Sequence, residues 1–259
     1  MITPAHGASR RSSHAMKRVI AFCLWGSDPF YWKGAIENAR IAQTLFPGWE
    51  CLYHVASQKI PENDLRELQS LENTRIIEHP GEGDPSGMLW RFEEADSPDV
   101  DVFLSRDTDS RLSERERWAV DRWLASGRRF HVMRDHPEHR CAMLGGMWGC
   151  RSTGTGQLKT AIALWLHCRS GKPCHGMDQD FLAEVVWPEA RKDCVVHDPF
   201  FSGRPFPQRR RVRDGIYFVG ERFSADNRPA FLNDRDALDA WVSKWCYLKW
   251  IRRFRPCRF

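Results

Sequence analysis

Short apolar runs alternate with helix-like patterns over the first 110 residues, and this alternation restricts the fold more than any other feature of the chain. The runs have the length of buried strands, and apolar residues at helical spacing fill the longer gaps between them. Connections of this length are too long for hairpins, so the strands should run parallel, with helices covering both faces of the sheet. The expected strands are 17–26, 49–55, 74–80 and 100–105, and the expected long helices are 32–45 and 61–71.

The second half of the chain continues with less regular elements. Ser113 and Glu116 have the spacing of a capping box, which predicts a helix that begins there and ends near Gly127. Further expected elements are strands at 129–135 and 193–198, a glycine-rich strand or turn at 141–150, and helices at 155–168 and 178–187. No repeat is visible, so we expect one elaborated α/β domain over 17–222, between a disordered leader (1–16) and a helical basic tail (223–259).

Composition excludes several classes of protein. No apolar run approaches the roughly 18 residues that a membrane span needs. The nine cysteines, an odd number without a Cys-X-X-Cys pair, argue against a disulfide framework and for a reducing compartment such as the cytoplasm. The net charge of +5 suits contact with phosphate or anionic lipid. The chain has no helix-turn-helix, RRM or zinc-finger signature, so we expect no nucleic-acid partner.

The fourth expected strand ends in two aspartates, Asp107 and Asp109, which are flanked by Arg106 and Arg111. In α/β proteins, ligands bind just past the carboxyl ends of the parallel strands. Mg²⁺ and Mn²⁺ prefer oxygen ligands, and one or two carboxylates together with substrate phosphates form their usual shell. The pair therefore suits a divalent cation bridged to a diphosphate, and its alternative is a solvated turn.

Other acidic and imidazole side chains follow strands or open helices, and each has a structural alternative. His197 ends the last expected strand, where it can complete a metal shell or fill the interior. Asp178 and Gln179 open a helix, where the helix dipole also favours an acidic first turn. Asp135 lies in a proline-containing loop and is a candidate for acceptor binding, or for the general base of an inverting enzyme. Its alternative is a solvated turn.

Basic and glycine residues complete the candidate site. Arg91 and Arg106 carry guanidinium groups that suit phosphate, and either can instead pair with an acidic neighbour. Gly145 and Gly146 allow the backbone to approach a ligand closely, as they also would in a strand bulge.

Four short motifs then occur in a characteristic order: RDTDS after a strand, the glycine-rich LGGMWG, the helical DQDFL and the late VVHD. This order resembles nucleotide-sugar glycosyltransferases of the GT-A fold, in the style of the glycogenin and lipopolysaccharide galactosyltransferase family. The longer string from RDTDSRLSERE to LGGMWG is similar to a group of bacterial and large-virus proteins classed with glycosyltransferases. The resemblance covers about residues 17–222.

The resemblance implies a metal site, a donor-sugar contact and a nucleotide-base contact. The implied metal ligands are Asp107, Asp109 and His197. The implied sugar-facing pair is Asp178 and Gln179, and Trp25 at the end of the first strand lies where the base would bind.

One further motif departs from the family pattern. Gly203-Arg204-Pro205-Phe206 corresponds loosely to the family's Gly-X-X-Lys-Pro-Trp, whose lysine contacts the diphosphate. Arg204 would then contact the phosphates. Because arginine replaces lysine and phenylalanine replaces tryptophan, the sequence leaves open whether the anomeric configuration is retained or inverted.

The resulting hypothesis is a metal-dependent glycosyltransferase with a GT-A-type α/β sandwich and Mn²⁺ or Mg²⁺ as its cofactor. It would move a sugar from a nucleoside diphosphate sugar to a glycan, lipid or protein acceptor. An alternative enzyme is a metal-dependent nucleotidyl or phosphoryl transferase, because the same carboxylate pair serves phosphates generally. The alternative without catalysis is a basic polyanion-binding protein.

The C-terminal segment combines an apolar stripe with a basic end. Leu238, Trp241, Trp245 and Leu248 recur at helical spacing. We favour a helix that packs on the domain, and the alternative is a helix that lies at the inner face of the membrane through its aromatic and basic residues. The expected location is the cytoplasm, with peripheral membrane contact under the second interpretation.

Overall fold

The protein is described here by a computed structural model that defines residues 17–208, 210 and 215–253, with side chains of the last helix defined as far as Lys244. The predicted leader, 1–16, lies outside the described residues. The strands are β1 (Arg18–Leu24), β2 (Trp49–Ala56), β3 (Thr74–His79), β4 (Val102–Ser105), β5 (Phe130–Met133), β6 (Trp148–Arg151) and β7 (Cys194–His197). They form one sheet in the order β3-β2-β1-β4-β6-β5-β7.

The sheet is mostly parallel, as expected. β1 pairs in parallel with β2 and β4, β2 with β3, and β5 with β7. β6 is the exception, because it runs antiparallel to both β4 and β5. The glycine-rich segment that was expected as a strand or turn therefore becomes an irregular loop over 141–147 followed by this reversed strand.

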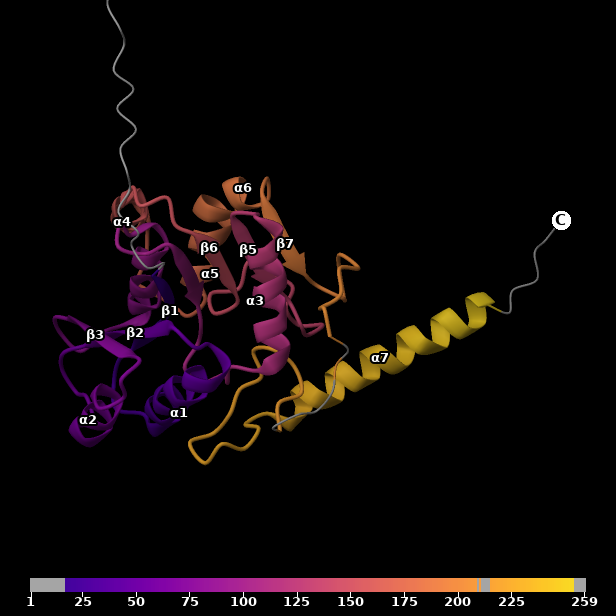
Figure 1. Ribbon diagram of the computed structural model, residues 1–259, viewed down its shortest axis with the longest axis horizontal. Helices are drawn as coiled ribbons and strands as arrows, with labels where there is room; N and C mark the ends of the chain where they lie inside the picture. The colour runs from indigo at the N-terminus through magenta and orange to yellow at the C-terminus, as the bar shows by residue number, and fades with distance from the viewer. Residues whose placement is uncertain (1–16, 209, 211–214, 254–259) are drawn as a thin grey trace, which may run out of the picture.

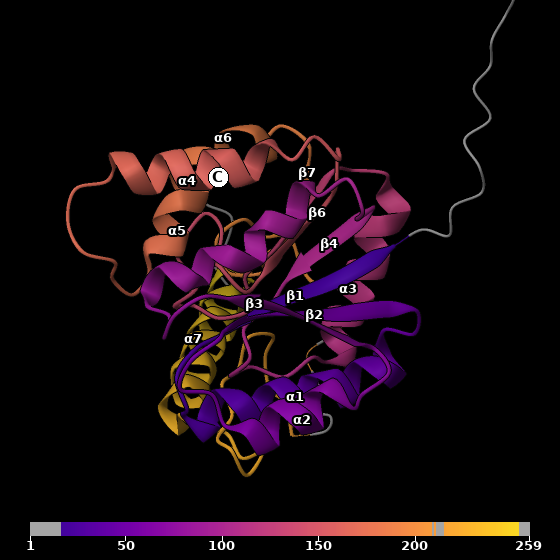
Figure 2. The same cartoon turned by 90° about the vertical axis from the view of Figure 1, so that its left-hand side faces the viewer.

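Helices cover both faces of the sheet (Figure 2). The α-helices are α1 (Pro29–Leu45), α2 (Glu62–Gln69), α3 (Glu114–Ser126), α4 (Gln157–Cys168), α5 (Met177–Phe181), α6 (Trp187–Ala190) and α7 (Leu232–Arg253). A 3₁₀-helix, η1 (Pro85–Asp96), precedes β4, and a π-helical turn, η2 (Leu182–Val186), joins α5 to α6. α1, α2 and α3 contribute to one hydrophobic cluster, and η1, α4 and α5 contribute to the other.

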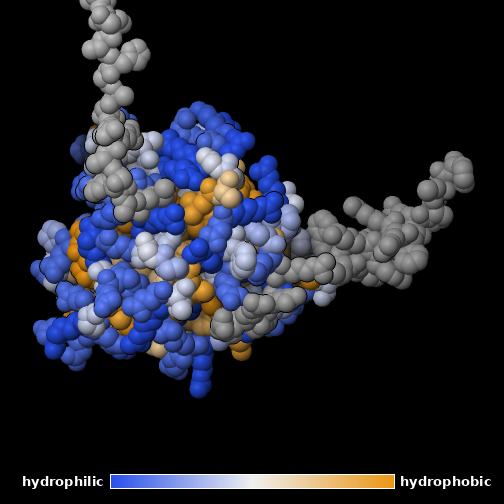
Figure 3. All heavy atoms as spheres, viewed as in Figure 1, coloured by the Kyte–Doolittle hydropathy of each residue, from blue (hydrophilic) through white to orange (hydrophobic). Residues whose placement is uncertain are grey.

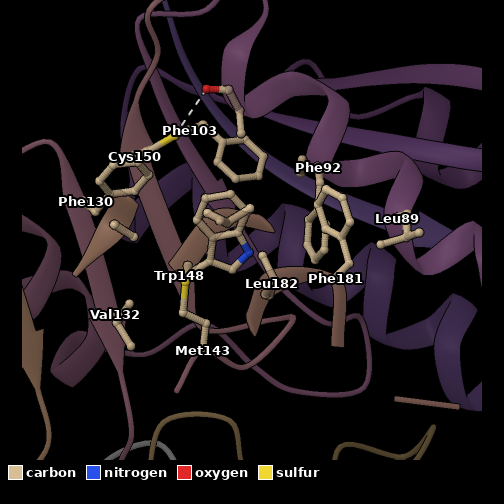
Figure 4. Close-up of a cluster of buried hydrophobic side chains, with 14 of the residues drawn as sticks. Leu89, Phe92, Phe103, Phe130, Val132, Met143, Trp148, Cys150, Phe181 and Leu182 are labelled. Atoms are coloured by element: carbon tan, nitrogen blue, oxygen red, sulfur yellow. Dashed lines mark hydrogen bonds between the residues drawn. The ribbon is translucent and has the colours of Figure 1, made fainter. Parts of the chain in front are cut away.

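The core beneath η1 and α5 is aromatic (Figure 4). The ring of Phe92 stacks on Phe181 at 6.2 Å between centroids, and the indole of Trp148 meets Phe92 and Phe103 edge to face at 5.4 and 5.0 Å. These side chains come from η1, α5, β6 and β4, so the cluster fixes η1 and α5 over the central strands. That placement matters because both elements carry residues of the candidate site.

The local signals of α3 operate largely as predicted. The side chain of Ser113 accepts a hydrogen bond from the backbone N–H of Glu116 at 3.2 Å, and the helix ends at Gly127 with φ of +72°. The second half of the capping box is absent, because the carboxylate of Glu116 pairs with Arg106. Glu116 therefore connects the helix to the strand end of β4.

The C-terminal helix α7 begins against the domain and projects away from it (Figure 1). Leu238 is fully buried with Phe200 and Phe218, and Trp241 meets Phe200 edge to face at 4.7 Å. The side chains of Trp245 and Leu248 lie outside the described residues. The first two positions of the predicted stripe thus pack on the domain, and membrane contact by the remainder stays a prediction.

The surface has no extended apolar face in the view of Figure 3, where hydrophobic residues form small separate patches among hydrophilic ones. Within the described part of the chain, none of the helices combines the length and the apolar character needed to cross a membrane. The expectation of an α/β domain with a mostly parallel sheet and a C-terminal helical extension is confirmed.

Candidate active site

A cavity of about 450 Å³ opens at the carboxyl ends of β1 and β4. Its wall combines the end of β1, the helix η1, the loop after β4, the loop before β6, the start of α5, and residues between 218 and 234. This is the edge of an α/β sheet at which ligands bind. The cavity brings together six predicted site residues: Trp25, Arg91, Asp107, Asp109, Gly145 and Asp178, and Gln179 also lines it.

The two aspartates after β4 face this cavity from one short loop. Asp107 is half exposed, and its carboxylate accepts a hydrogen bond from Arg91. Asp109 is held nearby, because its carbonyl accepts a hydrogen bond from the backbone N–H of Phe223 at 2.8 Å. Burial, and then the charge of Asp107, raise the pKa of Asp109 to about 6. The two carboxylates thus repel each other, which is the electrostatic condition that a bound divalent cation relieves.

Arg91 is almost fully buried and joins the two acidic elements of the site. Its Nη1 donates to the carbonyl of Arg106 at 2.8 Å and to the Asp107 carboxylate, while its Nη2 donates to Oδ2 of Asp178 at 3.1 Å. One guanidinium therefore serves two carboxylates on separate elements. Burial raises the pKa of Asp178, and Arg91 offsets only part of that increase.

The paired glycines make room for these carboxylates. A Cβ atom on Gly145 would lie 1.9 Å from Oδ2 of Asp178, and one on Gly146 would lie 2.0 Å from Oδ2 of Asp107. Both distances are too short for any larger residue unless the carboxylate moves. Sequence reasoning expected the glycines to admit a ligand, and their observed neighbours are the acidic side chains that would bind it.

The donor-facing pair lies in the first turn of α5. Asp178 is buried, and its Oδ1 accepts a hydrogen bond from the backbone N–H of Gln179 at 3.0 Å. Gln179 is partly exposed on the cavity wall. Asp178 thus has a local capping contact and also lines the cavity, so the structure combines the two alternatives that the sequence left open.

Arg106 is not in the cavity, which corrects the expectation that it contacts phosphate. Its guanidinium is buried against Glu116, and its Nη1 donates to the carbonyls of Ser105 and Trp148 at 2.6 and 3.0 Å. Successive residues of an extended chain point to opposite sides. Because Asp107 points to the cavity, its neighbour Arg106 points into the domain.

Asp135 also has a different position from the one expected of an acceptor contact or general base. Its carboxylate is fully buried and accepts hydrogen bonds from Arg115 at 2.6 and 2.8 Å and from Arg210 at 2.7 Å. The backbone N–H of Val219 donates a further bond at 3.0 Å. Burial alone would raise the pKa of Asp135, but Arg115 and Arg210 outweigh it and hold that pKa below its usual range. Asp135 therefore stabilises the fold.

His197 and Arg204 lie outside the cavity wall. Nδ1 of His197 is 2.8 Å from Nε2 of His131, and β6 and β5 separate its strand from β4 in the sheet. Arg204 is exposed and pairs through its backbone with Asp198. The described residues contain no group of three or more His, Cys, Asp or Glu side chains arranged to hold a metal. The structure thus leaves the two aspartates without the predicted imidazole.

Several cavity residues were missed by sequence reasoning. Arg222 lines the wall, where its guanidinium pairs with Asp234 at 3.2 Å and stacks over the ring of Phe231 at 3.8 Å. His136, Glu138, His139 and His175 also line it. The sequence segment Arg134–His139 drew attention for its imidazoles and carboxylates, but only its Asp135 was selected. Nothing in the sequence around Arg222 signals a site.

Comparisons with known proteins give a fold likeness at low similarity. No protein-family model matches the chain, and no curated protein matches its sequence. A glycosyltransferase involved in the glycosylation of the major capsid of PBCV-1 is 14% identical with a TM-score of 0.46, over 71% of this chain and 82% of that one. A 4-diphosphocytidyl-2C-methyl-D-erythritol synthase from Anaerococcus prevotii is 8% identical with a TM-score of 0.43, over 70% and 86%. At these scores neither likeness carries an argument about activity.

Proposed function

We propose that the cavity binds a nucleoside diphosphate sugar with Mn²⁺ or Mg²⁺ and transfers the sugar to a hydroxyl group of a glycan, lipid or protein acceptor. The observation that carries the proposal is the pair Asp107 and Asp109 at the strand end, open to a cavity of about 450 Å³ that would hold a ligand of this size. A divalent cation shared between these carboxylates and a diphosphate would neutralise the departing nucleotide.

The charges of the wall support a metal-assisted rather than a simple basic site. Asp107, Asp109 and Asp178 face the cavity together with Glu138 and Asp234. The cations that line it, Arg91 and Arg222, are already paired with carboxylates. A polyanion would meet net negative charge here unless a metal were present, which disfavours the non-catalytic polyanion binder. The absence of His197 from the site does not weaken a magnesium-type shell, because two carboxylates plus phosphate oxygens suffice.

The remaining residues would position the reactants. Asp178 and Gln179 on α5 lie across the cavity wall from the metal-binding loop, where they would hydrogen-bond sugar hydroxyls. Arg222 takes the phosphate-binding role that the sequence assigned to Arg204. In the transfer, the bond between the anomeric carbon and the diphosphate oxygen breaks, a bond to the acceptor oxygen forms, and the hydroxyl proton leaves the acceptor.

Metal-dependent nucleotide binding tests this proposal. UDP, GDP and their sugar conjugates should raise the melting temperature of the wild type only when Mn²⁺ is present, because a ligand that binds the folded state stabilises it by mass action. Asp109→Ala should fold normally and lose this increase. Asp99→Ala, at an exposed carboxylate before β4, is the matched control and should keep it.

Two outcomes would contradict the proposal. Equal metal-dependent binding by Asp109→Ala and the wild type would remove the metal assignment. Release of pyrophosphate from a nucleoside triphosphate, in place of nucleoside diphosphate from a sugar conjugate, would identify a nucleotidyl transferase. The alternatives are therefore separated by the product as well as by binding.

A further inference from the structure

The cavity extends beyond the aspartates into a second end, which the proposed metal and diphosphate would not occupy. This end is lined by His136, Glu138, His139, Phe218, Gly220 and Asp234. These residues come from the loop after β5, the segment around 220, and the first turn of α7. The two ends are close, since the charge of Asp107 affects the pKa of His139.

The hydrogen bonds of His139 fix where its ring proton lies. Its Nδ1 accepts a hydrogen bond from the backbone N–H of Asp135 at 3.1 Å. A backbone N–H can only donate, so Nδ1 carries a lone pair and the neutral ring carries its proton on Nε2. Burial, and then the neighbouring His136, lower the pKa of His139 to about 3, so the ring is neutral near pH 7. Nε2–H has no hydrogen-bond partner among the residues that the structure defines.

His136 differs from His139, because both of its nitrogens are occupied. Its Nδ1 accepts from the backbone N–H of Glu138 at 3.1 Å, and its Nε2–H donates to the carbonyl of Asp234 at 2.7 Å. Its ring also packs on Phe218 at 4.6 Å between centroids. His136 therefore holds the loop, α7 and the aromatic wall together, and His139 is the imidazole with a free donor.

Glu138 supplies the complementary group. Its side chain is largely exposed and pairs with Arg140 at 3.1 Å, while it also lines the cavity. Arg222, the cation on this side of the wall, is paired with Asp234. The second end thus offers one N–H donor, one carboxylate acceptor and the aromatic ring of Phe218, without an unpaired cation among the described residues. A neutral polyol matches these groups, and an anionic acceptor does not.

We propose that this end is the acceptor subsite for a neutral, hydroxyl-bearing sugar, with the Nε2–H of His139 donating to one sugar oxygen and Glu138 accepting from a sugar hydroxyl. The inference rests on the proposed glycosyl transfer, because an acceptor subsite requires a donor. His139 acts here as a binding residue. A protonated Nε2 can neither remove a proton from the acceptor nor coordinate a metal.

Transfer kinetics of three variants test the subsite. The probes are glucose, galactose, mannose, N-acetylglucosamine and their octyl glycosides, with glucuronic acid as the anionic counterpart, and the readout is release of nucleoside diphosphate. At least one neutral probe should stimulate release by the wild type. His139→Ala should raise KM for that probe by about tenfold or more, with kcat changed less than about threefold. His139→Gln, which retains an N–H donor, should recover part of the loss, and His167→Ala, at an exposed histidine on α4, should behave as wild type.

Binding of UDP or GDP with Mn²⁺ is measured on the same variants to separate this subsite from the metal site. It should be unchanged in His139→Ala. An unchanged KM, stimulation by glucuronic acid alone, or no stimulation by any neutral probe would overturn the subsite while leaving nucleotide binding intact. Loss of metal-dependent nucleotide binding in His139→Ala would make the residue a metal ligand and also overturn it. Failure of the proposed function is distinct, since the wild type itself would then show no metal-dependent nucleotide binding.

Nitrogen NMR of the wild type keeps the inference testable if the variants unfold. Long-range proton–nitrogen spectra should show the His139 ring protonated on Nε2, and addition of the stimulating sugar should shift that nitrogen. A proton on Nδ1, or an Nε2 signal that does not respond to any probe, would contradict the subsite. Melting curves of each variant show whether a kinetic change reflects loss of folding.

Discussion

The ends of β4 and β5 carry the same pair of residues in the same order, and the two pairs have opposite environments. β4 is followed by Arg106 and Asp107, and β5 by Arg134 and Asp135. After β4 the aspartate is half exposed at the cavity. After β5 the aspartate is fully buried.

The supply of partners explains the difference. Asp107 shares a single guanidinium, that of Arg91, with Asp178. Asp135 has Arg115 and Arg210 to itself, together with a backbone N–H. A carboxylate with unmet demand for positive charge is suited to bind a cation, and one that is fully paired contributes to stability. The comparison teaches that a strand-terminal aspartate acquires its role from residues that are distant in sequence.

The largest expected effect is on stability. Asp135→Ala should lower the free energy of unfolding by roughly 3–5 kcal/mol, because it leaves Arg115 and Arg210 as buried cations without their partner. Asp107→Ala should change it by less than about 1 kcal/mol, since its carboxylate is half exposed. Urea titrations of both variants measure the difference. Equal losses in the two variants would show that the strand ends are not distinguished as described.

A smaller effect should appear in the pH dependence. The pKa of Asp135 lies below its usual range, so its ionised form stabilises the fold above about pH 4, and this contribution is lost as the pH falls through the lowered pKa. The difference in unfolding free energy between the wild type and Asp135→Asn should therefore be constant from pH 7 to pH 5 and shrink below about pH 4. Urea titrations at several pH values measure it. A difference that persists in full at the lowest pH would mean that packing, rather than charge, is lost.

The smallest effect on stability should accompany a clear loss of activity at Gln179. This residue is partly exposed on the cavity wall beside the buried Asp178. Gln179→Ala should reduce turnover by about tenfold, because a sugar contact is lost, with little change in melting temperature. Gln58→Ala, at an exposed loop position, is the control. Normal turnover with a lowered melting temperature would restore a purely structural role for this helix start.

The features predicted from sequence are those whose causes are local. Apolar alternation predicted the strands and their covering helices, and the cap residues Ser113 and Gly127 correctly bounded α3. Alternation along an extended chain also implied that Arg106 and Asp107 point apart, although that consequence was not drawn. The reversed direction of β6 has no local signal, because it is set by pairing with β4 and β5.

The features that sequence reasoning missed depend on residues far apart in the chain. Asp135 is captured by Arg210, which is 75 positions away, and the second end of the cavity combines the loop around His139 with the first turn of α7. His197 was placed at the site by family resemblance, but β7 lies beyond β6 and β5 in the sheet order. Such contacts become visible only once the topology is known.

The attachment of α7 has a mechanical consequence. The helix has 22 residues, which at ~1.5 Å per residue gives a rod of roughly 33 Å. The rod is clamped near its beginning, where Asp234 holds His136 and Arg222, and it extends freely from the body (Figure 1). A sideways load at the far end acts on that clamp with a long lever arm. Anything that grips the outer turns of α7 would therefore apply torque to the wall of the cavity itself.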